Sequence, residues 1–336
     1  MKILAFGEVM MRLMPPDYKR LTQTNHLEYL FSGTGVNVLS GLYQMGDQPY
    51  FTTVLPDNAV GNAAAAHIRK LGIRDDFISY KGDHIGIYVL EKGLGNRPSQ
   101  VTYLNRKESS FGKSNISNYD IDSILEGMEA IHICGISLAI SHEVREVAYQ
   151  FAKKAKEKGL KIIFDCNFRS SLWNEEEKKQ VKDIYEKMLY LADVVFAGYK
   201  DATLLLNMPV DKELAYIEQI RNVLQDMCSK YNIEIIFGTN REHRKGKDYI
   251  QGYYVTATEG LITELYPLTI YDRVGGGDGF AVGAIHAYMH NYEEEKMIEF
   301  ATLSGVLAHT TYGDSPIVSK AEILNIIENG YCDIQR

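Results

Sequence analysis

Short apolar runs alternate with longer segments of helical periodicity along most of the chain. Residues 142–158 and 175–191 carry apolar positions at three- and four-residue spacing, which predicts two amphipathic helices, and Gly159 is the expected cap of the first. Strands that are apolar at nearly every position and lie between such helices are typical of a parallel sheet covered on both faces. The pattern therefore predicts an α/β fold with a mostly parallel sheet sandwiched by helices. The expected strands are Ile3–Phe6, Ala130–Cys134, Lys161–Asp165, Asp193–Ala197 and Glu234–Phe237.

One region departs from this alternation. Residues 85–93 (IGIYVLEKG) and 99–106 (SQVTYLNR) are strand-like runs joined by a turn that contains Gly, Asn, Arg and Pro, which is typical of a β-hairpin. Together with Met10–Leu13 and Tyr29–Phe31, they are expected to form a small antiparallel sheet outside the main one. We interpret this sheet as a lid; an extra hairpin without function is the alternative. The lid is expected to comprise about residues 10–32 and 84–107 of a single domain that spans residues 1–336.

Composition and charge narrow the class of partner. The chain has 336 residues, of which 45% are hydrophobic and 24% are charged, so it can bury a sizeable core. Its formal net charge is −8 and its Lys and Arg residues are scattered, which disfavours nucleic acid because binding to a phosphate backbone needs a basic face. A small anionic substrate remains compatible, since a few local arginines can outweigh the net charge.

The cysteines and the apolar runs favour a cytoplasmic protein that does not enter a membrane. Cys134, Cys166, Cys228 and Cys332 are widely spaced and form no CxxC pair, which favours buried thiols in a reducing compartment over disulfides or a zinc site. The opening MKILAFGE predicts a first strand and is too short for a signal peptide. No apolar run approaches the roughly 18 residues that a membrane helix needs.

Residues 271–280 (YDRVGGGDGF) place four glycines around one aspartate, directly before a helical pattern. The first three glycines permit close approach of a ligand to the backbone, and the amides at a helix start favour anions such as phosphate. Asp278 is expected to have a lowered pKa in the free protein and to accept the proton of an attacking hydroxyl. A glycine-rich loop with Asp278 as a helix cap is the alternative. Phe280 argues against a dinucleotide fingerprint, and the absence of a following Lys-Ser or Lys-Thr argues against a Walker loop.

This turn resembles the C-terminal signature of the ribokinase-like (PfkB) carbohydrate kinases, which usually reads DTVGAGDAF. The DRVGGGD form is typical of the 2-keto-3-deoxygluconate kinase branch of that family. The resemblance implies a ribokinase-like fold and makes Asp278 the catalytic base, in contact with the sugar. It also implies that the amides of Gly275, Gly276 and Gly277 form the anion hole, with Gly275 and Gly277 touching the nucleotide.

Residues 31–46 (FSGTGVNVLSGLYQMG) combine a small-residue turn with a helix start and are similar to the N-terminal signature of the family. The resemblance implies that Gly33 and Asn37 bind the sugar. Taken alone, such a turn can also be purely structural.

Residues 165–173 (DCNFRSSLW) follow an expected strand and resemble the D-x-N-x-R-x-x-L-W motif of the family. A surface arginine is the alternative, but the motif implies that Arg169 contacts ATP phosphate or the carboxylate of the substrate. The planar fork of arginine suits either group because it binds pairs of oxygens. Asn167 beside it is implied on the nucleotide side.

Tyr88, Tyr103 and Arg106 match residues that the keto-deoxygluconate branch places over its sugar acid. A sugar acid needs a cation there and a neutral hexose does not, so this segment carries the substrate prediction. The branch usually shows Y-x-R-x-x-S, whereas YLNRKESS has one more residue between Tyr and Arg. Whether Arg106, Lys107 or Asn105 faces inward is therefore open. A solvated cross-strand pair is the alternative.

Later segments are similar to the nucleotide- and substrate-binding positions of the family. IIFGTNREHRKG (235–246) implies that Thr239 and Arg241 contact the nucleotide, and Thr302 is implied in the adenine pocket. LAHTTYGDSP (307–316) implies that Asp314 accepts a hydroxyl of the substrate.

The mid-chain motif that helps to arrange Mg²⁺ in the family is altered in this chain. Gly198 and Asp201 stand where the family often has N-x-x-E. Loss of the Asn weakens a direct role in metal binding, so no residue is assigned as a metal ligand. An acid at a helix start is the alternative role of Asp201.

The resemblance extends from Gly7 to about Pro316. It implies an enzyme that uses ATP and Mg²⁺ to phosphorylate 2-keto-3-deoxy-D-gluconate at its 6-hydroxyl; a need for a monovalent cation is left open. A fructokinase- or ribokinase-like kinase of a neutral sugar is the alternative enzyme. A sensor without catalysis is a further alternative, although Asp278 is kept, and a structural module is another. Apolar strand edges in the lid predict a homodimer through it.

Overall fold

The computed structural model describes residues 1–272 and 274–330, and its central sheet has ten strands. Strands from β11 to β5 run parallel to their neighbours, whereas β12 is antiparallel to β11, β13 and β14. The expected mostly parallel sheet is therefore confirmed. Its strands, in spatial order, are β13 (Gly260–Ile262), β12 (Lys247–Val255), β11 (Ile235–Arg244), β10 (Val194–Phe196), β9 (Lys161–Asp165), β8 (Ala130–Cys134), β1 (Lys2–Phe6), β4 (Gln48–Leu55) and β5 (Arg74–Tyr80), with β14 (Tyr266–Leu268) beside β12.

Each predicted strand of this sheet is present. β8 (AIHIC) and β9 (KIIFD) have the predicted bounds, because their runs are mostly apolar and end at a helix or a polar residue. β11 continues past Phe237 to Arg244, where the chain turns back into β12. β4, β5, β12, β13 and β14 are additional to the predicted strands.

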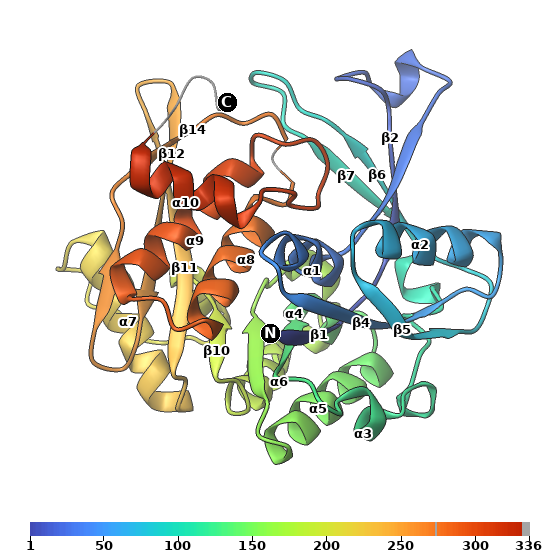
Figure 1. Ribbon diagram of the computed structural model, residues 1–336, viewed down its shortest axis with the longest axis horizontal. Helices are drawn as coiled ribbons and strands as arrows, with labels where there is room; N and C mark the ends of the chain where they lie inside the picture. Colours follow the sequence, from blue (N-terminus) through green and yellow to red (C-terminus); the bar gives the residue numbers. More distant parts are fainter. Residues whose placement is uncertain (273, 331–336) are drawn as a thin grey trace.

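Helices cover both faces of the sheet (Figure 1). The alternation in β1 shows why: Ile3 and Ala5 belong to one apolar core, and Leu4 and Phe6 belong to the other. The first core packs against α1 (Thr34–Gln44), α2 (Ala59–Lys70), α8 (Gly276–Met289), α9 (Glu294–Ala308) and α10 (Lys320–Asn329). The second packs against α3 (Ile121–Ile124), α4 (Gly135–Leu138), α5 (His142–Glu157), α6 (Val181–Leu189) and α7 (Tyr216–Tyr231).

The predicted helices are present with small changes at their ends. α5 ends at Glu157, and Gly159 follows with a φ of 73°, the left-handed conformation that a helix end favours. The predicted helix at 175–191 starts later, as α6, after a 3₁₀ turn at Glu177–Lys179.

The predicted small sheet is also present, and it projects from the central sheet at the upper right of Figure 1. Its outer pairs are antiparallel, and its central pair, β2 with β6, is parallel. Along β2, Met10, Arg12 and Met14 point inward, since buried and half-buried positions alternate. The order of its strands is β3 (Glu28–Ser32), β2 (Met10–Met14), β6 (Gly86–Glu91) and β7 (Gln100–Leu104).

Helices α1 and α8 are held together in their middle and at their C-terminal ends. A Cβ atom added to Gly41 of α1 would lie 2.4 Å from a methyl carbon of Val282 in α8, so the two backbones approach closely. Asp47 follows α1, and its two carboxylate oxygens lie 2.7 Å from Nδ1 of His286, in the last turn of α8, and 2.8 Å from Nε2 of His290, just after it. These contacts keep the two helices in one fixed arrangement.

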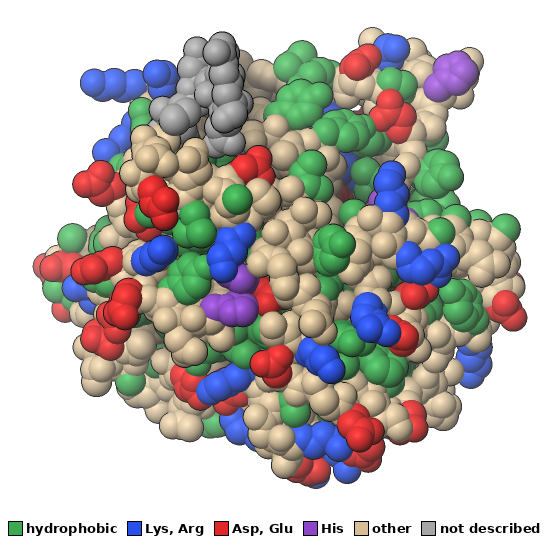
Figure 2. All heavy atoms as spheres, viewed as in Figure 1, with side chains coloured by type: hydrophobic (Ala, Val, Ile, Leu, Met, Phe, Trp, Pro, Cys, Tyr) green, Lys and Arg blue, Asp and Glu red, His purple; other side chains and the backbone are tan. Residues whose placement is uncertain are grey.

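The surface carries both signs of charge close together. On the face in Figure 2, Lys and Arg side chains are interspersed with Asp and Glu side chains. None of the helices within residues 1–272 and 274–330 is both long and apolar enough to span a bilayer. Cys134, Cys166 and Cys228 are buried free thiols, as predicted, and Cys332 lies outside the described residues.

His132 makes the stability of the protein depend on pH. It is fully buried in β8, and neither ring nitrogen has a hydrogen-bond partner among the described residues. Burial lowers the pKa of His132 from 6.5 to about 4. The unfolded chain therefore takes up a proton more readily, so this stability is present above about pH 6.5 and is lost as the pH falls towards 4.

We expect wild type to lose about 2–3 kcal/mol more unfolding free energy than His132→Leu between pH 7 and pH 4.5. Urea unfolding of both proteins at the two pH values measures the difference. Equal losses in the two proteins would show that His132 is not the source.

Candidate functional site

A cavity of about 890 Å³ lies between the central sheet, the small sheet and the starts of α1 and α8. Glu8 follows β1, Asp165 ends β9 and Ala197 follows β10, so the cavity opens at the carboxyl ends of the parallel strands. Ligands of open α/β sheets bind at these ends. The predicted site residues that line it are Gly33, Asn37, Tyr88, Tyr103, Arg106, Asn167, Arg169, Thr239, Arg241, Gly275, Gly277, Asp278 and Asp314.

Each glycine before Asp278 has its own structural reason. Gly275 caps α8 with a φ of 88°, and a Cβ there would lie 2.1 Å from the backbone oxygen of Asp314. Gly276 is buried, and a Cβ there would lie 2.1 Å from the ring of His309. Gly277 lines the cavity, and no described atom lies within 4 Å of the position of an added Cβ. The start of α8 is therefore open to a ligand at Gly277 and closely packed at the other two glycines.

Gly275→Ala is expected to lower the unfolding free energy by about 1–3 kcal/mol, because alanine disfavours the left-handed backbone and would collide with the Asp314 carbonyl. Gly277→Ala is the matched control, and it is expected to leave the unfolding free energy unchanged or to raise it by up to about 1 kcal/mol, because alanine favours the helix and has room there. Urea unfolding measures both. Equal stability of the two variants would contradict the account of this turn.

Asp278 lies in the first turn of α8, and its Oδ2 accepts a hydrogen bond from Nδ2 of Asn37 at 2.7 Å. The prediction of a lowered pKa is wrong. Desolvation in the cavity wall is the main cause that raises the pKa of Asp278 to about 8. The Asn37 hydrogen bond and Arg169 oppose the rise, and the carboxylates of Asp165 and Asp314 add to it. A carboxyl group poised near neutral pH suits a proton acceptor.

Two more carboxyl groups share the cavity. Desolvation, followed by the neighbouring charge of Asp201, raises the pKa of Asp165 to about 7. Desolvation also raises the pKa of Asp201, whose Oδ2 accepts a hydrogen bond from the amide of Gly198 at 2.8 Å. Asn167 donates to Asp165 at 3.4 Å and accepts from Nε of the exposed Arg169 at 3.0 Å. Carboxylate oxygens beside a cation suit a phosphate group that carries a divalent metal ion.

Arg106 faces the cavity, which answers the question that the sequence leaves open. Its Nε donates to Oε2 of Glu8 at 2.7 Å, and its guanidinium lies 5.0 Å from the ring centre of Tyr103. NH1 of Arg106 and Oε1 of Glu8 are buried without a hydrogen-bond partner among the described residues. Lys107 and Asn105 are exposed. A buried donor without a partner in the cavity wall suits an anionic ligand.

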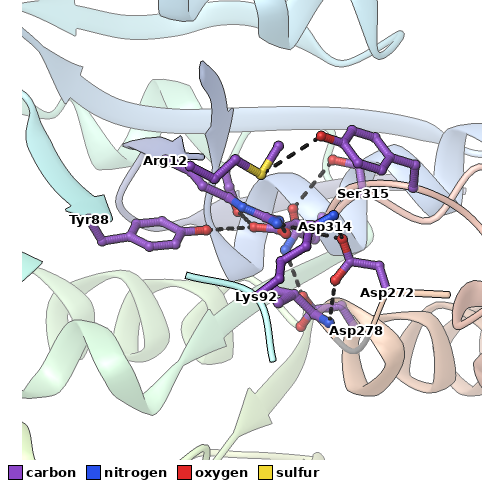
Figure 3. Close-up of polar contacts among 12 residues, drawn as sticks. Arg12, Tyr88, Lys92, Asp272, Asp278, Asp314 and Ser315 are labelled. Carbon is purple, nitrogen blue, oxygen red and sulfur yellow. Dashed lines mark hydrogen bonds and ion pairs between the residues drawn. The ribbon is translucent and has the colours of Figure 1, made fainter. Parts of the chain in front are cut away.

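Asp314 connects the small sheet to the loop after α9 (Figure 3). Its Oδ2 accepts hydrogen bonds from Ser32 at 2.5 Å and from Tyr88 at 2.6 Å. Its Oδ1 accepts from NH1 of Arg12, which is fully buried. Both carboxylate oxygens therefore have partners within the protein before any substrate hydroxyl binds.

The predicted nucleotide residues divide into two groups. Thr239 and Arg241 of β11 line the cavity, and NH2 of Arg241 lies 3.0 Å from Nε2 of His309. Thr302 is fully buried in α9 and donates to the backbone oxygen of Ile298 at 2.7 Å, so the structure does not bring it to the cavity with the others.

Three residues of this region are additional to the predicted site. Glu8 and Asp165 have a visible signal, because each is an acid at the carboxyl end of an expected strand. Arg12 has a weaker one: a cation occupies the inward position between Met10 and Met14 of an alternating strand.

Comparison with known proteins agrees with this geometry. Residues 1–321 match the family described as pfkB family carbohydrate kinase. A 2-dehydro-3-deoxygalactonokinase of Haloferax volcanii is 24% identical over 100% of this chain and 99% of its own length. A 2-dehydro-3-deoxygluconokinase of Bacillus subtilis is 25% identical over 93% of this chain and 90% of its own.

Solved structures similar to this chain also include proteins named as kinases of this sugar acid. A proposed 2-keto-3-deoxygluconate kinase from Enterococcus faecalis has a TM-score of 0.96 and 40% identity, covering 100% of this chain and 98% of its own. The 2-dehydro-3-deoxygluconokinase of Thermotoga maritima has a TM-score of 0.91 and 33% identity, covering 98% and 100%. An Escherichia coli protein of the ribokinase type, solved with ATP and Mg²⁺, has a TM-score of 0.79 at 18% identity over 97% of this chain and 99% of its own, which shows a shared fold.

Proposed function

Because the chain belongs to the pfkB family of carbohydrate kinases, we propose that it phosphorylates 2-keto-3-deoxy-D-gluconate with ATP at the 6-hydroxyl. The observation that carries the proposal is the placement of Arg106. A buried guanidinium with a free NH1 faces the same cavity as Asp278, so one cavity offers a cation for an acid and a base for a hydroxyl.

Asp278 takes the proton of the sugar hydroxyl as its oxygen attacks the γ-phosphorus. The amides at the start of α8, in Gly275, Gly276 and Gly277, favour the negative charge of the transferring group. Gly277 is the most open of these glycines to a ligand. Asn37 holds the Asp278 carboxyl through its 2.7 Å hydrogen bond and so fixes the direction in which the base points.

The substrate end of the cavity lies against the small sheet. Arg106 and Tyr103 receive the carboxylate of the sugar acid, with Tyr88 beside them. Gly33, at the start of α1, also lines this end, and its backbone packs closely against that of Glu8: a Cβ there would lie 2.1 Å from the Glu8 carbonyl oxygen.

The nucleotide end has the groups that Mg·ATP needs. Arg169, Thr239 and Arg241 line it and offer donors to phosphate and ribose, with Asn167 fixing Arg169. Mg²⁺ usually keeps several waters and is held by one or two carboxylates plus phosphates, so Asp165 and Asp201 fit this role without a closed protein cage. Bound Mg²⁺ neutralises charge on the transferring phosphoryl group. The free thiols fit a reducing, ATP-containing compartment, which we propose to be the cytoplasm.

The names of the relatives support a keto-deoxy sugar acid as the substrate class, with the gluco and galacto forms both represented. A kinase of a neutral sugar is the second candidate, because the same fold occurs in fructokinases. The buried Arg106 favours the acid, since a carboxylate gives its NH1 a charge-assisted hydrogen bond and a neutral sugar gives it only a hydroxyl acceptor.

A coupled assay of ADP release tests the proposal with purified enzyme, Mg·ATP and a panel of sugars. The panel comprises 2-keto-3-deoxygluconate, its galactonate epimer, fructose and ribose. We expect kcat/KM for the keto-deoxy acids to exceed that for fructose at least about 100-fold, because a neutral sugar offers no charged acceptor to NH1 of Arg106. Fructose or ribose as the best substrate would overturn it. Exchange of K⁺ for Na⁺ in the buffer tests a monovalent-cation requirement.

We also propose a homodimer through the small sheet. The outward face of this sheet carries apolar side chains, among which Tyr29 is 62% exposed and Leu104 is 43% exposed. A second copy of the chain would cover them. Light scattering is expected to give twice the chain mass, and Tyr29→Glu combined with Leu104→Glu is expected to give the single-chain mass. A wild-type monomer at assay concentration would contradict this proposal.

A further inference from the structure

Arg12 is a buried cation that no step of the proposed chemistry uses. It lies at the inward-facing middle of β2 and is 0% exposed. Its NH1 donates to Asp314, and its NH2 lies 3.5 Å from Oδ2 of Asp272 (Figure 3). Lys92, which follows β6, reaches the same Asp272 oxygen at 3.3 Å. Two cations of the small sheet thus face two carboxylates of the main body.

The two carboxylates belong to two loops that meet at the turn: Asp272 lies in the loop before it, and Asp314 lies in the loop after α9. Asp272 precedes the turn, and its Oδ1 accepts a hydrogen bond from the amide of Val274 at 3.2 Å. Asp314 touches the turn directly, because a Cβ on Gly275 would lie 2.1 Å from its backbone oxygen. Arg12 therefore holds both loops.

A second series of contacts connects the loop that contains Asp314 with Asp278, the proposed base. Ser315, next to Asp314, lies 3.4 Å from Oδ1 of Asn37, and Asn37 donates to Asp278 at 2.7 Å. The orientation of the Asp278 carboxyl thus depends on a loop that Arg12 anchors.

Burial of a guanidinium is unfavourable unless oppositely charged groups surround it. The closed position of the small sheet and the arrangement of the two loops therefore stabilise each other. If the sheet moves away, Arg12, Asp272 and Asp314 all lose partners at once.

We propose that Arg12 is a positioning residue that couples closure of the small sheet to assembly of the turn at Gly275–Asp278. The catalytic part of this inference rests on the proposed function, and the structural part does not. Arg12 acts through Asp272 and Asp314, and it is not among the described residues that line the cavity.

The first experiment needs no substrate. Amide hydrogen exchange of the ligand-free protein is compared for wild type, Arg12→Met and Arg145→Met. Arg145 is the matched control, since it is also buried and donates to Leu138 and Glu177, away from the small sheet. We expect Arg12→Met to raise exchange at least about tenfold in β2, in β6 and at 274–279, because it removes the partner of two buried carboxylates. Arg145→Met is expected to leave these segments unchanged.

The second experiment measures catalysis on the best sugar of the panel. Arg12→Met is expected to lower kcat/KM at least about 100-fold, because small displacements of catalytic groups are costly, and to raise sugar-independent ATP hydrolysis relative to transfer. Its affinity for a non-hydrolysable ATP analogue is expected to stay within about threefold of wild type. Arg12→Lys is expected to recover part of the loss, and the exposed Arg69→Met is the neutral control.

The outcomes of the two experiments either support or overturn the proposed role of Arg12. Unchanged exchange at 274–279 in a folded Arg12→Met protein overturns the coupling, whatever the substrate is. Loss of kcat/KM together with loss of analogue binding also overturns it, because the effect is then not one of positioning. If Arg12→Met does not fold, Asp272→Asn replaces it and must show the same exchange pattern. A wild type that is inert on every sugar refutes the proposed function, and the exchange result still decides the structural part.

Discussion

Asp278→Asn is expected to lower kcat by about 10³-fold or more, because a positioned base that takes the hydroxyl proton contributes roughly 10²–10⁴-fold to the rate and asparagine cannot accept that proton. The substitution keeps the shape of the side chain, and its amide oxygen can still accept from Asn37. Affinities for sugar and for an ATP analogue are therefore expected to stay within about threefold of wild type. Single-turnover phosphoryl transfer with radiolabelled ATP measures the chemical step itself.

The pH profile provides the control for this variant. With the pKa of Asp278 raised to about 8 in the free enzyme, the ionised fraction of the base falls as the pH drops below that value. Wild-type kcat/KM is therefore expected to fall about tenfold per pH unit on the acid side, and the residual activity of Asp278→Asn is expected to lack this limb. Near-normal turnover of the variant would remove Asp278 from its assigned role.

Arg106→Met is expected to lower kcat/KM for the keto-deoxy acid by about 10²–10³-fold, because the substrate carboxylate loses a charge-assisted hydrogen bond in a desolvated site. Fructose phosphorylation, however slow, is expected to change less than about fivefold, since a neutral sugar makes no use of the charge. The ratio of the two kcat/KM values is the quantity to measure.

The Glu8 carboxylate complicates the single variant, because it loses its partner when Arg106 is removed. Combining Glu8→Gln with Arg106→Met removes both charges, and it is expected to restore folding stability without restoring activity on the acid. Arg106→Lys keeps a cation and serves as the second control. An equal loss on the acid and on fructose in the Arg106→Met protein would mean that the residue supports the fold of the site, with no part in selecting the substrate.

Much of the fold follows from local apolar pattern. β8 and β9 match their predicted bounds because a strand buried on both faces is apolar at nearly every position. β5 reads RDDFISY, with half-buried and exposed positions at the edge of the sheet, so it lacks that pattern. Edge strands are hard to detect from sequence for this reason.

Which residues line the site was easier to predict from the sequence than the pKa values of its carboxyl groups. The turn before α8 and a polar residue of segment 105–107 were expected to face one cavity; the sequence left open which residue it is, and Arg106 lines the cavity with the turn. The pKa of Asp278 could not be predicted, because desolvation by distant segments outweighs the local helix start. Thr302 faces a backbone oxygen of its own helix, which depends on how α9 is rotated against β12.

Helices α1 and α8 are held together at Asn37–Asp278, at Gly41–Val282 and at Asp47 with its two histidines. The base and its partner therefore belong to one stiff unit, whereas Tyr103 lies in β7 of the small sheet and Arg106 follows that strand. Mutations that change substrate selectivity can therefore accumulate in that sheet without displacing Asp278 or Asn37. This division offers a physical route by which one ancestral scaffold diversifies towards epimeric sugar acids.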